Sequence, residues 1–543
     1  MNAQTFDMLI GPSRTKSVLG VVITSIAVIA LFKRVIGIRK GNTSEFKNIP
    51  MPKGSYFYLG KLQTSQPKLL IAYHIFLLGH IPLMAKNSGK AMRKWHDECG
   101  LVYRIKMGVQ NWLFIGDPQM AHDIFVTKGS FTSNRSHCTF LSLLNGNRQS
   151  AILFADNEHW KYARSTLNTI FSSRSIDSLS YALEDEIGQS IDLMIKDAQE
   201  LGEIDPIIYI RLTTMNVFLV LAFSISGARS VDDPLYIKMN HVVEKSVSFI
   251  DPALDISNML PLWKFFDIFS SKKHQMTEFL ENEVKPFIRS IIERARTSEK
   301  DNLMKKLDEA KGQDKLDETH IVALITETLI AATDTVSITT TWAIAYLCNH
   351  PKVQEKMHQE IDAFVKKHGH VPSFTDRAEL PYCFSFQKEC LRFRPPGFTG
   401  IPHKISKDIV YKDCLIPKDT LIIASVSILN YRADMLKNAD EFIPERYIED
   451  TRSISACNSM HTTKRTDITF GFGRRTCPGS YLAEREMFSM LIELISKCTI
   501  KPILSSKGTP IYPKLDEYID ETVIAPPAQF KVRLIKREKE VVN

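Results

Sequence analysis

Hydrophobic and polar positions along the chain separate a short β portion from a long helical portion. Residues 101–116 have the pattern of two short strands around a turn at Gly108. From about 155 to 350 the apolar spacing is helical, with few glycines or prolines. Residues 401–425 return to the alternation typical of strands. The pattern therefore predicts one large, mainly α domain with a minor β portion.

The longest helical pattern runs from Ile321 to His350. It begins after the capping-type residues Asp317 and Glu318 and ends at Pro351. Its length of about 30 residues is well above the mean helix length of about 11–12. A helix this long and this apolar has to pass through the middle of a large core.

An apolar segment near the N-terminus predicts a membrane anchor. Residues 17–32 carry no charge, and at about 1.5 Å per residue they form roughly 24 Å of helix. Lys33 and Arg34 can snorkel, so residues 35–38 can extend the buried stretch. A cleaved signal peptide also has a short apolar region, but no small-x-small cleavage site follows this one. An uncleaved anchor is therefore favoured.

The charges beside this segment predict its orientation. More basic residues follow it than precede it, which places the rest of the chain in the cytosol by the positive-inside rule. A single N-terminal span in the endoplasmic reticulum membrane of a eukaryotic cell fits this arrangement. We assign residues 1–40 to the anchor and 41–60 to a proline-containing hinge, which gives a stiff exit from the membrane.

Composition excludes several classes of protein. The chain has 543 residues, of which 44% are hydrophobic and 24% charged, so it is neither disordered, collagen-like nor a polytopic membrane protein. A net charge of +8 is mild at this length, and no basic patch with interleaved aromatic residues indicates nucleic-acid binding. The nine cysteines include no CxxC pair, which argues against a disulfide framework or a zinc ribbon.

The stretch FGFGRRTCPG precedes an amphipathic helical pattern and carries the chemistry of the chain. Pro478 suits the first position of that helix, which predicts that Cys477 lies at or near its N-terminus. There the helix dipole and free amides stabilise a thiolate. Gly471 and Gly473 permit a tight loop, and Arg475 offers a cation to an acidic group. The alternative is a glycine turn with an incidental buried cysteine.

This stretch resembles the haem-binding loop of the cytochrome P450 family. The pattern Phe-x-x-Gly-x-Arg-x-Cys-x-Gly is met by Phe470, Gly473, Arg475, Cys477 and Gly479. Five fixed positions at this spacing recur by chance in about one chain in ten thousand. The resemblance implies haem b as cofactor, the Cys477 thiolate as ligand of its iron, and the cytochrome P450 fold, with the long central helix over the haem.

Further family motifs follow in the expected order. Glu389 and Arg392 match the Glu-x-x-Arg pair, whose charges share one helical face. Glu293 and Arg296 have the same spacing, but we interpret them as a solvated surface pair. The resemblance implies that Arg446, in FIPERY, completes a Glu-Arg-Arg triad that secures the core on the haem side. The resemblance covers residues 45–535 approximately, within a haem-binding catalytic domain of residues 61–543.

The sequence AATDT in the long helix matches the family's oxygen-activating motif. The family usually has glycine where this chain has Ala332. The small Ala331 and Ala332 leave room for dioxygen, and the Thr335 hydroxyl is spaced to bond back to the Ala331 carbonyl. The resemblance implies that Thr335 acts in oxygen activation and that Asp334 relays protons.

Other positions match the family as contacts of the cofactor. Trp160 and Arg164, spaced Trp-x-x-x-Arg, match a helix that meets a haem propionate, and the alternative is a core tryptophan beside a surface arginine. His403 matches a propionate-contacting position, although a single histidine in a strand is more often only structural. Arg475 is expected at a propionate as well.

The substrate is indicated only as a class. The positions that match substrate-lining regions are mostly apolar or small: Ile330, Ala331, Phe398, Thr399 and Val523. They imply a small lipophilic substrate such as a steroid-like compound, a fatty acid, a secondary metabolite or a xenobiotic, with lipophilic ring compounds favoured. The motifs look closest to those of membrane-anchored fungal microsomal members.

The resemblance implies a haem-thiolate monooxygenase. A thiolate ligand pushes electron density onto haem iron and favours O–O cleavage. Electrons are expected from NADPH through a membrane-bound NADPH–cytochrome P450 reductase, with cytochrome b5 as a second candidate donor. A haem-thiolate isomerase or hydroperoxide-cleaving enzyme, which needs no electrons, and a non-catalytic haem sensor are the alternatives. Both are disfavoured because the Cys loop and Thr335 match the monooxygenase pattern.

Overall fold

The computed structural model describes most of the chain after the N-terminal segment, namely residues 45–52, 79–84, 88–148, 150–154, 158–250, 259, 271–299, 302–311, 316–519 and 524–537. The predicted anchor, most of the hinge and the substrate-lining position Val523 lie outside these residues, so those predictions stay predictions. The chain divides into a small unit, residues 1–49 with 408–418, and a large unit that holds all the remaining residues.

The described part of the small unit is a hairpin. Strands β5 (Ile409–Tyr411) and β6 (Cys414–Ile416) pair antiparallel. Lys412 turns the chain between them with a φ of 53°. Glu45 adds a parallel bridge to Leu415.

Two sheets lie in the described part of the large unit. A five-stranded sheet has the order β1-β2-β7-β4-β3, and a three-stranded sheet has the order β10-β8-β9. β1 and β2 are the predicted hairpin, closed at Gly108 with a φ of 58°. β7 then joins β2 in parallel. The strands are β1 (Val102–Met107), β2 (Gln110–Ile115), β3 (Asn134–Arg135), β4 (His403–Lys404), β7 (Leu421–Ala424), β8 (Cys498–Leu504), β9 (Pro510–Ile511) and β10 (Val532–Lys536).

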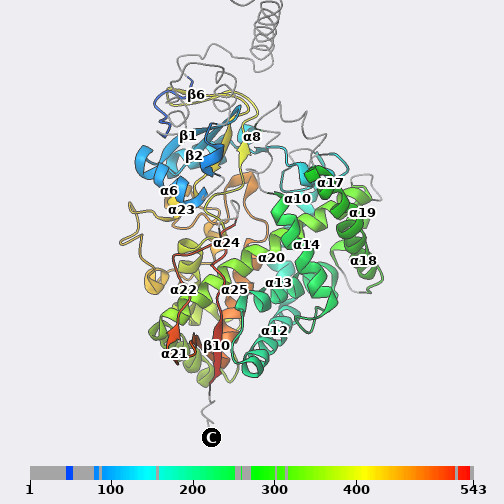
Figure 1. The fold of residues 1–543 in the computed structure, drawn as a ribbon, viewed down its shortest axis with the longest axis vertical. Coiled ribbons are helices and arrows are strands. Elements are labelled where there is room, and N and C mark those ends of the chain that lie inside the picture. The colour runs from blue at the N-terminus through cyan, green and yellow to red at the C-terminus, as the bar shows by residue number, and fades with distance from the viewer. Residues whose placement is uncertain are drawn as a thin grey trace, which may run out of the picture. The chain divides into compact units, whose positions relative to one another are not determined.

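Helices make up most of the large unit (Figure 1). The α-helices are α5 (Ile81–Met84), α6 (Ser88–Cys99), α7 (Pro118–Ala121), α8 (Gly129–Thr132), α9 (Thr139–Leu144), α10 (Glu158–Ile170), α11 (Ser173–Asp177), α12 (Ser180–Leu201), α13 (Pro206–Phe223), α14 (Pro234–Ile250), α17 (Ser271–Phe279), α18 (Lys285–Arg296), α19 (Leu303–Lys311), α20 (Glu318–Asn349), α21 (Pro351–His368), α22 (Pro381–Phe393), α23 (Val426–Asn430), α24 (Ile454–Cys457) and α25 (Ser480–Lys497). The π and 3-10 segments are η1 (His122–Thr127), η4 (Leu280–Val284), η5 (Phe374–Glu379), η6 (Pro444–Tyr447), η7 (Thr462–Lys464) and η8 (Gly473–Arg475).

The long predicted helix is α20. Its start is capped by the Asp317 side chain, which accepts a hydrogen bond of 2.9 Å from the His320 amide. It ends at Asn349, before Pro351, as the sequence predicts. Local capping chemistry therefore sets both ends of this helix.

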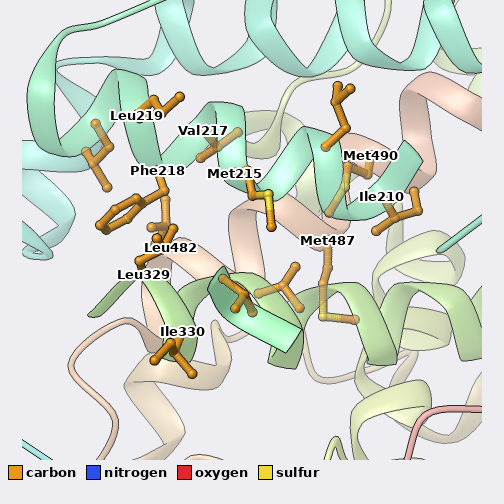
Figure 2. Close-up of a cluster of buried hydrophobic side chains, with 14 of the residues drawn as sticks. Ile210, Met215, Val217, Phe218, Leu219, Leu329, Ile330, Leu482, Met487 and Met490 are labelled. Carbon is orange, nitrogen blue, oxygen red and sulfur yellow. The ribbon is translucent and has the colours of Figure 1, made fainter. Parts of the chain in front are cut away.

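α20 packs against α13 and α25 in the centre of the large unit. Figure 2 shows side chains of the three helices meeting, among them Phe218 of α13, Leu329 of α20 and Met487 of α25. These three side chains are at most 2% exposed, and burying an apolar side chain of this size stabilises the fold by about 1.5–3 kcal/mol.

Within the described part of the chain, α13 and α20 are also the two helices long and apolar enough to cross a membrane. Their apolar windows are 78% and 83% buried inside the protein. This burial identifies them as core helices, since a helix that is apolar on all sides belongs in the interior of a large protein or in a membrane.

Candidate cofactor site and catalytic cavity

The cysteine loop is a tight turn closed by its own backbone. The Cys477 amide donates to the Phe470 carbonyl at 2.8 Å, and the Arg475 amide donates to that of Phe472 at 3.0 Å. Gly473 has a φ of 47°, and a Cβ there would approach the Phe125 carbonyl oxygen to 3.0 Å. Both the backbone angle and the close approach therefore require glycine at this position.

The start of α25 corrects one prediction. Pro478 is not the first helical residue, because the helix begins at Ser480 with Gly479 as its N-cap. Pro478 lies instead in a turn. The Gly479 backbone, in the same turn, lowers the pKa of the Cys477 thiol. Cys477 is thus near the helix N-terminus, as predicted.

The surroundings of Cys477 act on its pKa in opposite directions. Burial raises the pKa of the thiol, whereas the Gly479 amide and the Arg164 guanidinium lower it. Arg164, on α10, also donates to the Thr476 carbonyl. Among the described residues, no three His, Cys, Asp or Glu side chains are grouped to hold a metal ion. A lone thiolate suits an iron whose other ligands come from a macrocycle.

Strand pairing brings two basic side chains together. Arg135 of β3 pairs with His403 of β4, which the sequence singled out. The imidazole Nδ1 bonds to the Thr132 carbonyl at 2.8 Å, and the Arg135 Nη1 donates to the Pro402 carbonyl at 2.9 Å. Burial, with the charges of Arg135 and Arg475, holds the pKa of His403 well below its usual value. The positive electrostatic field around His403 therefore favours binding of an anion.

Arg475 extends this basic cluster into the cysteine loop. Its Nε donates to the Ser133 carbonyl at 3.0 Å, and its guanidinium lies 4.0 Å from the ring centroid of Trp160. The structure therefore brings together Arg475, Trp160 and His403, three residues that the sequence proposed around haem propionates. Guanidinium and imidazole donors in a positive field are suited to binding carboxylates. No sequence motif indicates that Arg135 belongs with them.

One face of α20 borders an internal space. Ala331 is exposed, and Ala332 and Thr335 are half-buried, although most of the helix is fully buried. The Thr335 hydroxyl donates to the Ala331 carbonyl at 2.9 Å, as the spacing predicts. Small side chains therefore leave a free surface in the middle of an otherwise close-packed helix.

A mostly apolar cavity of about 150 Å³ lies on this side of α20. It includes three of the five predicted substrate-lining positions, Ile330, Ala331 and Thr399, together with the predicted catalytic residues Asp334 and Thr335. Phe398 is not among its lining residues, because its ring packs edge-on against Tyr518 at a centroid distance of 4.8 Å. The other lining residues are Met92, Trp112, Phe114, Leu153, Phe154, Val247, Ile250, Gly400, Ile401, Pro402, Ile423 and Ile524.

Asp334 is held by a basic partner that the sequence did not reveal. The Arg211 Nε lies 3.2 Å from the Asp334 Oδ1, and Arg211 also pairs with the exposed Glu244. Burial raises the pKa of Asp334, and the charge of Arg211 opposes this shift. Only the packing of α13 on α20 brings Arg211 to this carboxylate.

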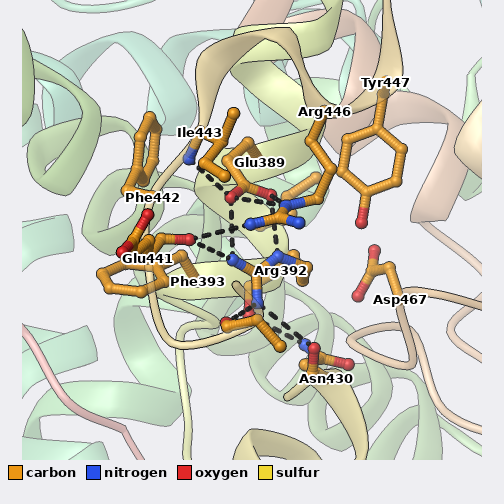
Figure 3. Close-up of polar contacts among 12 residues, drawn as sticks. Glu389, Arg392, Phe393, Asn430, Glu441, Phe442, Ile443, Arg446, Tyr447 and Asp467 are labelled. Carbon is orange, nitrogen blue, oxygen red and sulfur yellow. Dashed lines mark hydrogen bonds and ion pairs between the residues drawn. The ribbon is translucent and has the colours of Figure 1, made fainter. Parts of the chain in front are cut away.

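The structure brings the predicted Glu-Arg-Arg residues into one cluster (Figure 3). The Glu389 carboxylate accepts from Arg392 Nε at 2.7 Å and from Arg446 Nε at 3.0 Å. The Ile443 amide donates to the same carboxylate at 2.9 Å, and Arg392 also donates to the Ala439 carbonyl at 2.7 Å. Each buried charge therefore has an opposite charge or a carbonyl beside it.

The second Glu-x-x-Arg pair is more than a solvated surface pair, which corrects that interpretation. Glu293 and Arg296 do pair at 2.8 Å. Arg296, however, also binds Asp308 at 2.7 Å and Glu318 at 3.1 Å. These contacts raise the pKa of Arg296 and join α18 to α19 and α20.

Comparison with known proteins decides the family. A family model described as cytochrome P450 matches residues 68–532. The chain belongs to the cytochrome P450 family. A rat steroid 17-alpha-hydroxylase/17,20 lyase (Rattus norvegicus) is 24% identical over 82% of this P450 and 89% of its own length. The cytochrome P450 monooxygenase peniB of Penicillium patulum is 25% identical over 86% and 84%.

A solved structure supports the fold of this P450. A zebra fish cytochrome P450, determined with progesterone, superposes with a TM-score of 0.68 at 19% identity, covering 83% of this chain and 99% of that one. The predicted fold class, mainly α with a minor β portion, is confirmed. The family makes the protein a monooxygenase that uses haem. The Cys477 loop and the basic cluster fit that cofactor, offering one thiolate and several donors for carboxylates.

Proposed function

We propose that this P450 inserts one oxygen atom from O₂ into a lipophilic substrate bound in the cavity on α20. The observation that carries the proposal is the apolar lining of this cavity, which meets polar groups at Asp334, Thr335 and Thr399. When bound, a haem with a thiolate ligand supplies the oxidising chemistry and favours O–O cleavage. The protein positions the substrate, excludes water and delivers protons.

The cofactor is proposed to be held by the cysteine loop and the basic cluster. Cys477 is the thiolate ligand, and Phe470, Gly473 and Gly479 shape the loop that presents it. The haem carboxylates are bound by a basic and aromatic set: Arg475, His403, Trp160, Arg164 and, from the structure, Arg135. The pairing of β3 with β4 supports the last assignment, since it joins Arg135 to His403.

Proton delivery is assigned to Thr335 and Asp334. The Thr335 hydroxyl is held at the cavity by the Ala331 carbonyl. Asp334, in the next position, is connected through Arg211 to the exposed Glu244. This arrangement gives protons a polar path from the surface to the cavity in an otherwise apolar region.

The substrate class is lipophilic, with ring compounds of the steroid kind favoured. Several relatives are named steroid 17-alpha-hydroxylase/17,20 lyases, which supports a steroid-like substrate. The Penicillium patulum relative peniB is named as a cytochrome P450 monooxygenase, and its name states no substrate. The lining offers bulky aromatic surface from Trp112, Phe114 and Phe154. Such a lining binds by apolar burial and leaves orientation to the few polar groups.

Electrons are proposed to come from NADPH through a membrane-bound reductase, with cytochrome b5 as an additional donor. Residues 1–40 would anchor the enzyme in the endoplasmic reticulum membrane. Deleting residues 1–40 should weaken the association of the protein with the membrane, with some residual binding, and leave its haem spectrum intact. Secretion of a cleaved full-length protein would contradict the anchor.

Replacing Thr335 by valine tests the proposed reaction. The valine has nearly the same shape, so haem content and substrate binding should stay, while product formed per NADPH falls and hydrogen peroxide rises. Positioned proton delivery is worth about 10²–10⁴-fold, part of which water can replace. Thr333→Val is the matched control. The Thr333 hydroxyl donates to the Leu329 carbonyl at 2.8 Å on the same helix, but Thr333 is not among the residues that line the cavity.

The outcomes separate the classes of enzyme. A substrate-dependent NADPH consumption that loses its coupling to product in Thr335→Val supports the monooxygenase with this proton path. Unchanged coupling would remove Thr335 from the path. An isomerase, a hydroperoxide-cleaving enzyme or a haem sensor would show no NADPH-linked turnover in the wild-type protein.

A further inference from the structure

Glu327 is a fully buried carboxylate on α20 that the reaction does not use. It is 0% exposed and lies two helical turns before Asp334 and Thr335. An unpaired charge in such a position is costly to bury, so it requires several donors. The donors here all come from one short segment, residues 150–154, far away in the sequence.

Four hydrogen bonds join Glu327 to this segment. The Oε1 accepts from the Ala151 amide at 2.7 Å. The Oε2 accepts from the Ile152 amide at 2.9 Å, the Leu153 amide at 2.8 Å and the Ser150 hydroxyl at 3.0 Å. Three successive amides therefore converge on one carboxylate, an anion-binding arrangement of the backbone. Ser150 also accepts from the Phe154 amide at 2.7 Å, which closes the segment on itself.

The segment that Glu327 holds forms part of two functional surfaces. Leu153 and Phe154 line the cavity. The Ile152 carbonyl accepts from Arg475 Nη1 at 3.4 Å, which connects the segment to the cysteine loop. The position of one peptide segment thus sets both a wall of the cavity and a contact of a cofactor-loop arginine.

We propose that Glu327 is a positioning residue that fixes residues 150–154 as a wall of the substrate cavity and so restricts which molecules the cavity accepts. The inference rests on the proposed function, because it takes the cavity to be the substrate site. A side chain with one acceptor oxygen cannot accept all four bonds. Glutamine at this position would also turn an amide donor toward the converging N–H groups.

Binding of two nitrogen ligands to the haem-loaded full-length protein tests the proposal without turnover. Imidazole needs only the cofactor, whereas 4-phenylimidazole also needs the cavity wall. Both affinities are read from the shift of the haem absorption band. We expect Glu327→Gln to lower the preference for 4-phenylimidazole over imidazole about tenfold. Without the bonds to Glu327, residues 150–154 have to be ordered when the ligand binds, and this ordering reduces the affinity.

Two variants calibrate the measurement. Phe154→Ala trims the wall directly and should lower the same preference. Glu318→Gln makes the same substitution on the same helix, at a residue that pairs with Arg296 outside the cavity, and should leave it unchanged. A merely structural role of Glu327 would lower the thermal stability and leave the ratio of the two affinities as in the wild-type protein.

The outcomes are distinguishable from failure of the proposed function. If the wild-type protein binds 4-phenylimidazole no better than imidazole, the cavity is not the ligand site and the proposed function fails. If it prefers 4-phenylimidazole and haem-loaded Glu327→Gln keeps that preference, the role of Glu327 is overturned. If Glu327→Gln does not load haem, the same measurement is made on Ser150→Ala, which removes a single hydrogen-bond donor to Glu327. A lowered preference for 4-phenylimidazole in Ser150→Ala supports the proposal, and an unchanged preference overturns it.

Discussion

Two charged clusters of the large unit differ in how their charges are compensated. In the cluster around Glu389, one carboxylate is shared by Arg392 and Arg446, and Arg392 and Glu389 are both 0% exposed. In the cluster around His403, basic side chains gather instead, and Arg135 and Arg475 both lower the pKa of the imidazole. The first cluster balances its charges within the chain, and the second concentrates positive charge.

The difference separates a structural role from a binding role. A buried ion pair with all its hydrogen bonds made is close to balanced, and removing one member leaves an uncompensated charge. A group of basic side chains that creates a positive field lowers its energy when an anion binds. The comparison therefore predicts that the first cluster controls folding, whereas the second controls retention of an acidic cofactor.

The largest effect is expected from Glu389→Ala. It leaves the buried Arg392 and Arg446 without their shared carboxylate, so the free energy of unfolding should fall by about 3–5 kcal/mol. Denaturant unfolding of the purified protein and its yield of haem-loaded enzyme measure this. Glu293→Ala is the control, because Glu293 makes a comparable pair with its side chain 69% exposed. An equal loss of unfolding free energy in Glu389→Ala and Glu293→Ala would show that the cluster around Glu389 has no special role in folding.

Arg475→Met should act on the cofactor rather than on the fold. Removing a charged donor that faces a bound carboxylate costs about 1.5–3 kcal/mol, so haem should leave about tenfold to a hundredfold faster. Transfer of haem to apomyoglobin measures the rate, and unfolding of the haem-free protein should change little. Arg474→Met, at the exposed neighbouring position, serves as control. A large loss of stability without faster haem loss would assign Arg475 to the fold.

The smallest effect is a pH dependence that comes from His403. Its pKa is lowered in the folded protein, so below about pH 6.5 the unfolded chain binds the extra proton and stability falls by up to about 1.4 kcal/mol per pH unit. This loss of stability should be present in haem-free protein between pH 6.5 and 5. It should be smaller in haem-loaded protein, because the haem carboxylates offset the positive field around His403. His403→Gln should flatten the slope.

Thermal unfolding at several pH values, with and without haem, measures this dependence. The exposed His370, replaced by glutamine, is the control and should leave the slope in place. An equal slope in the haem-loaded and haem-free proteins would show that no anion enters the cluster around His403.

Much of the site could be predicted because it depends on neighbours along the chain. The Asp317 cap, the β1–β2 hairpin at Gly108 and the bond from Thr335 to the Ala331 carbonyl all join residues within a few positions. Helix and strand geometry fixes such contacts whatever the rest of the chain does. The cysteine loop belongs to the same class, since its closing bond joins Cys477 to Phe470.

The prediction that failed locally shows the limit of this reasoning. Pro478 suits a first helical position by propensity, but it lies in a turn, and the helix begins two residues later at Ser480. Propensity is therefore a weak guide to the exact first residue of a helix.

Only the tertiary structure brought Arg135 to His403, Arg211 to Asp334 and residues 150–154 to Glu327. Each of these contacts joins segments more than a hundred residues apart. Nothing in the spacing of such residues marks them as partners, because the pairing of two strands or the packing of two helices depends on the whole core. The sequence by itself determined the cofactor loop and the long helix, and long-range packing decided which charges surround them.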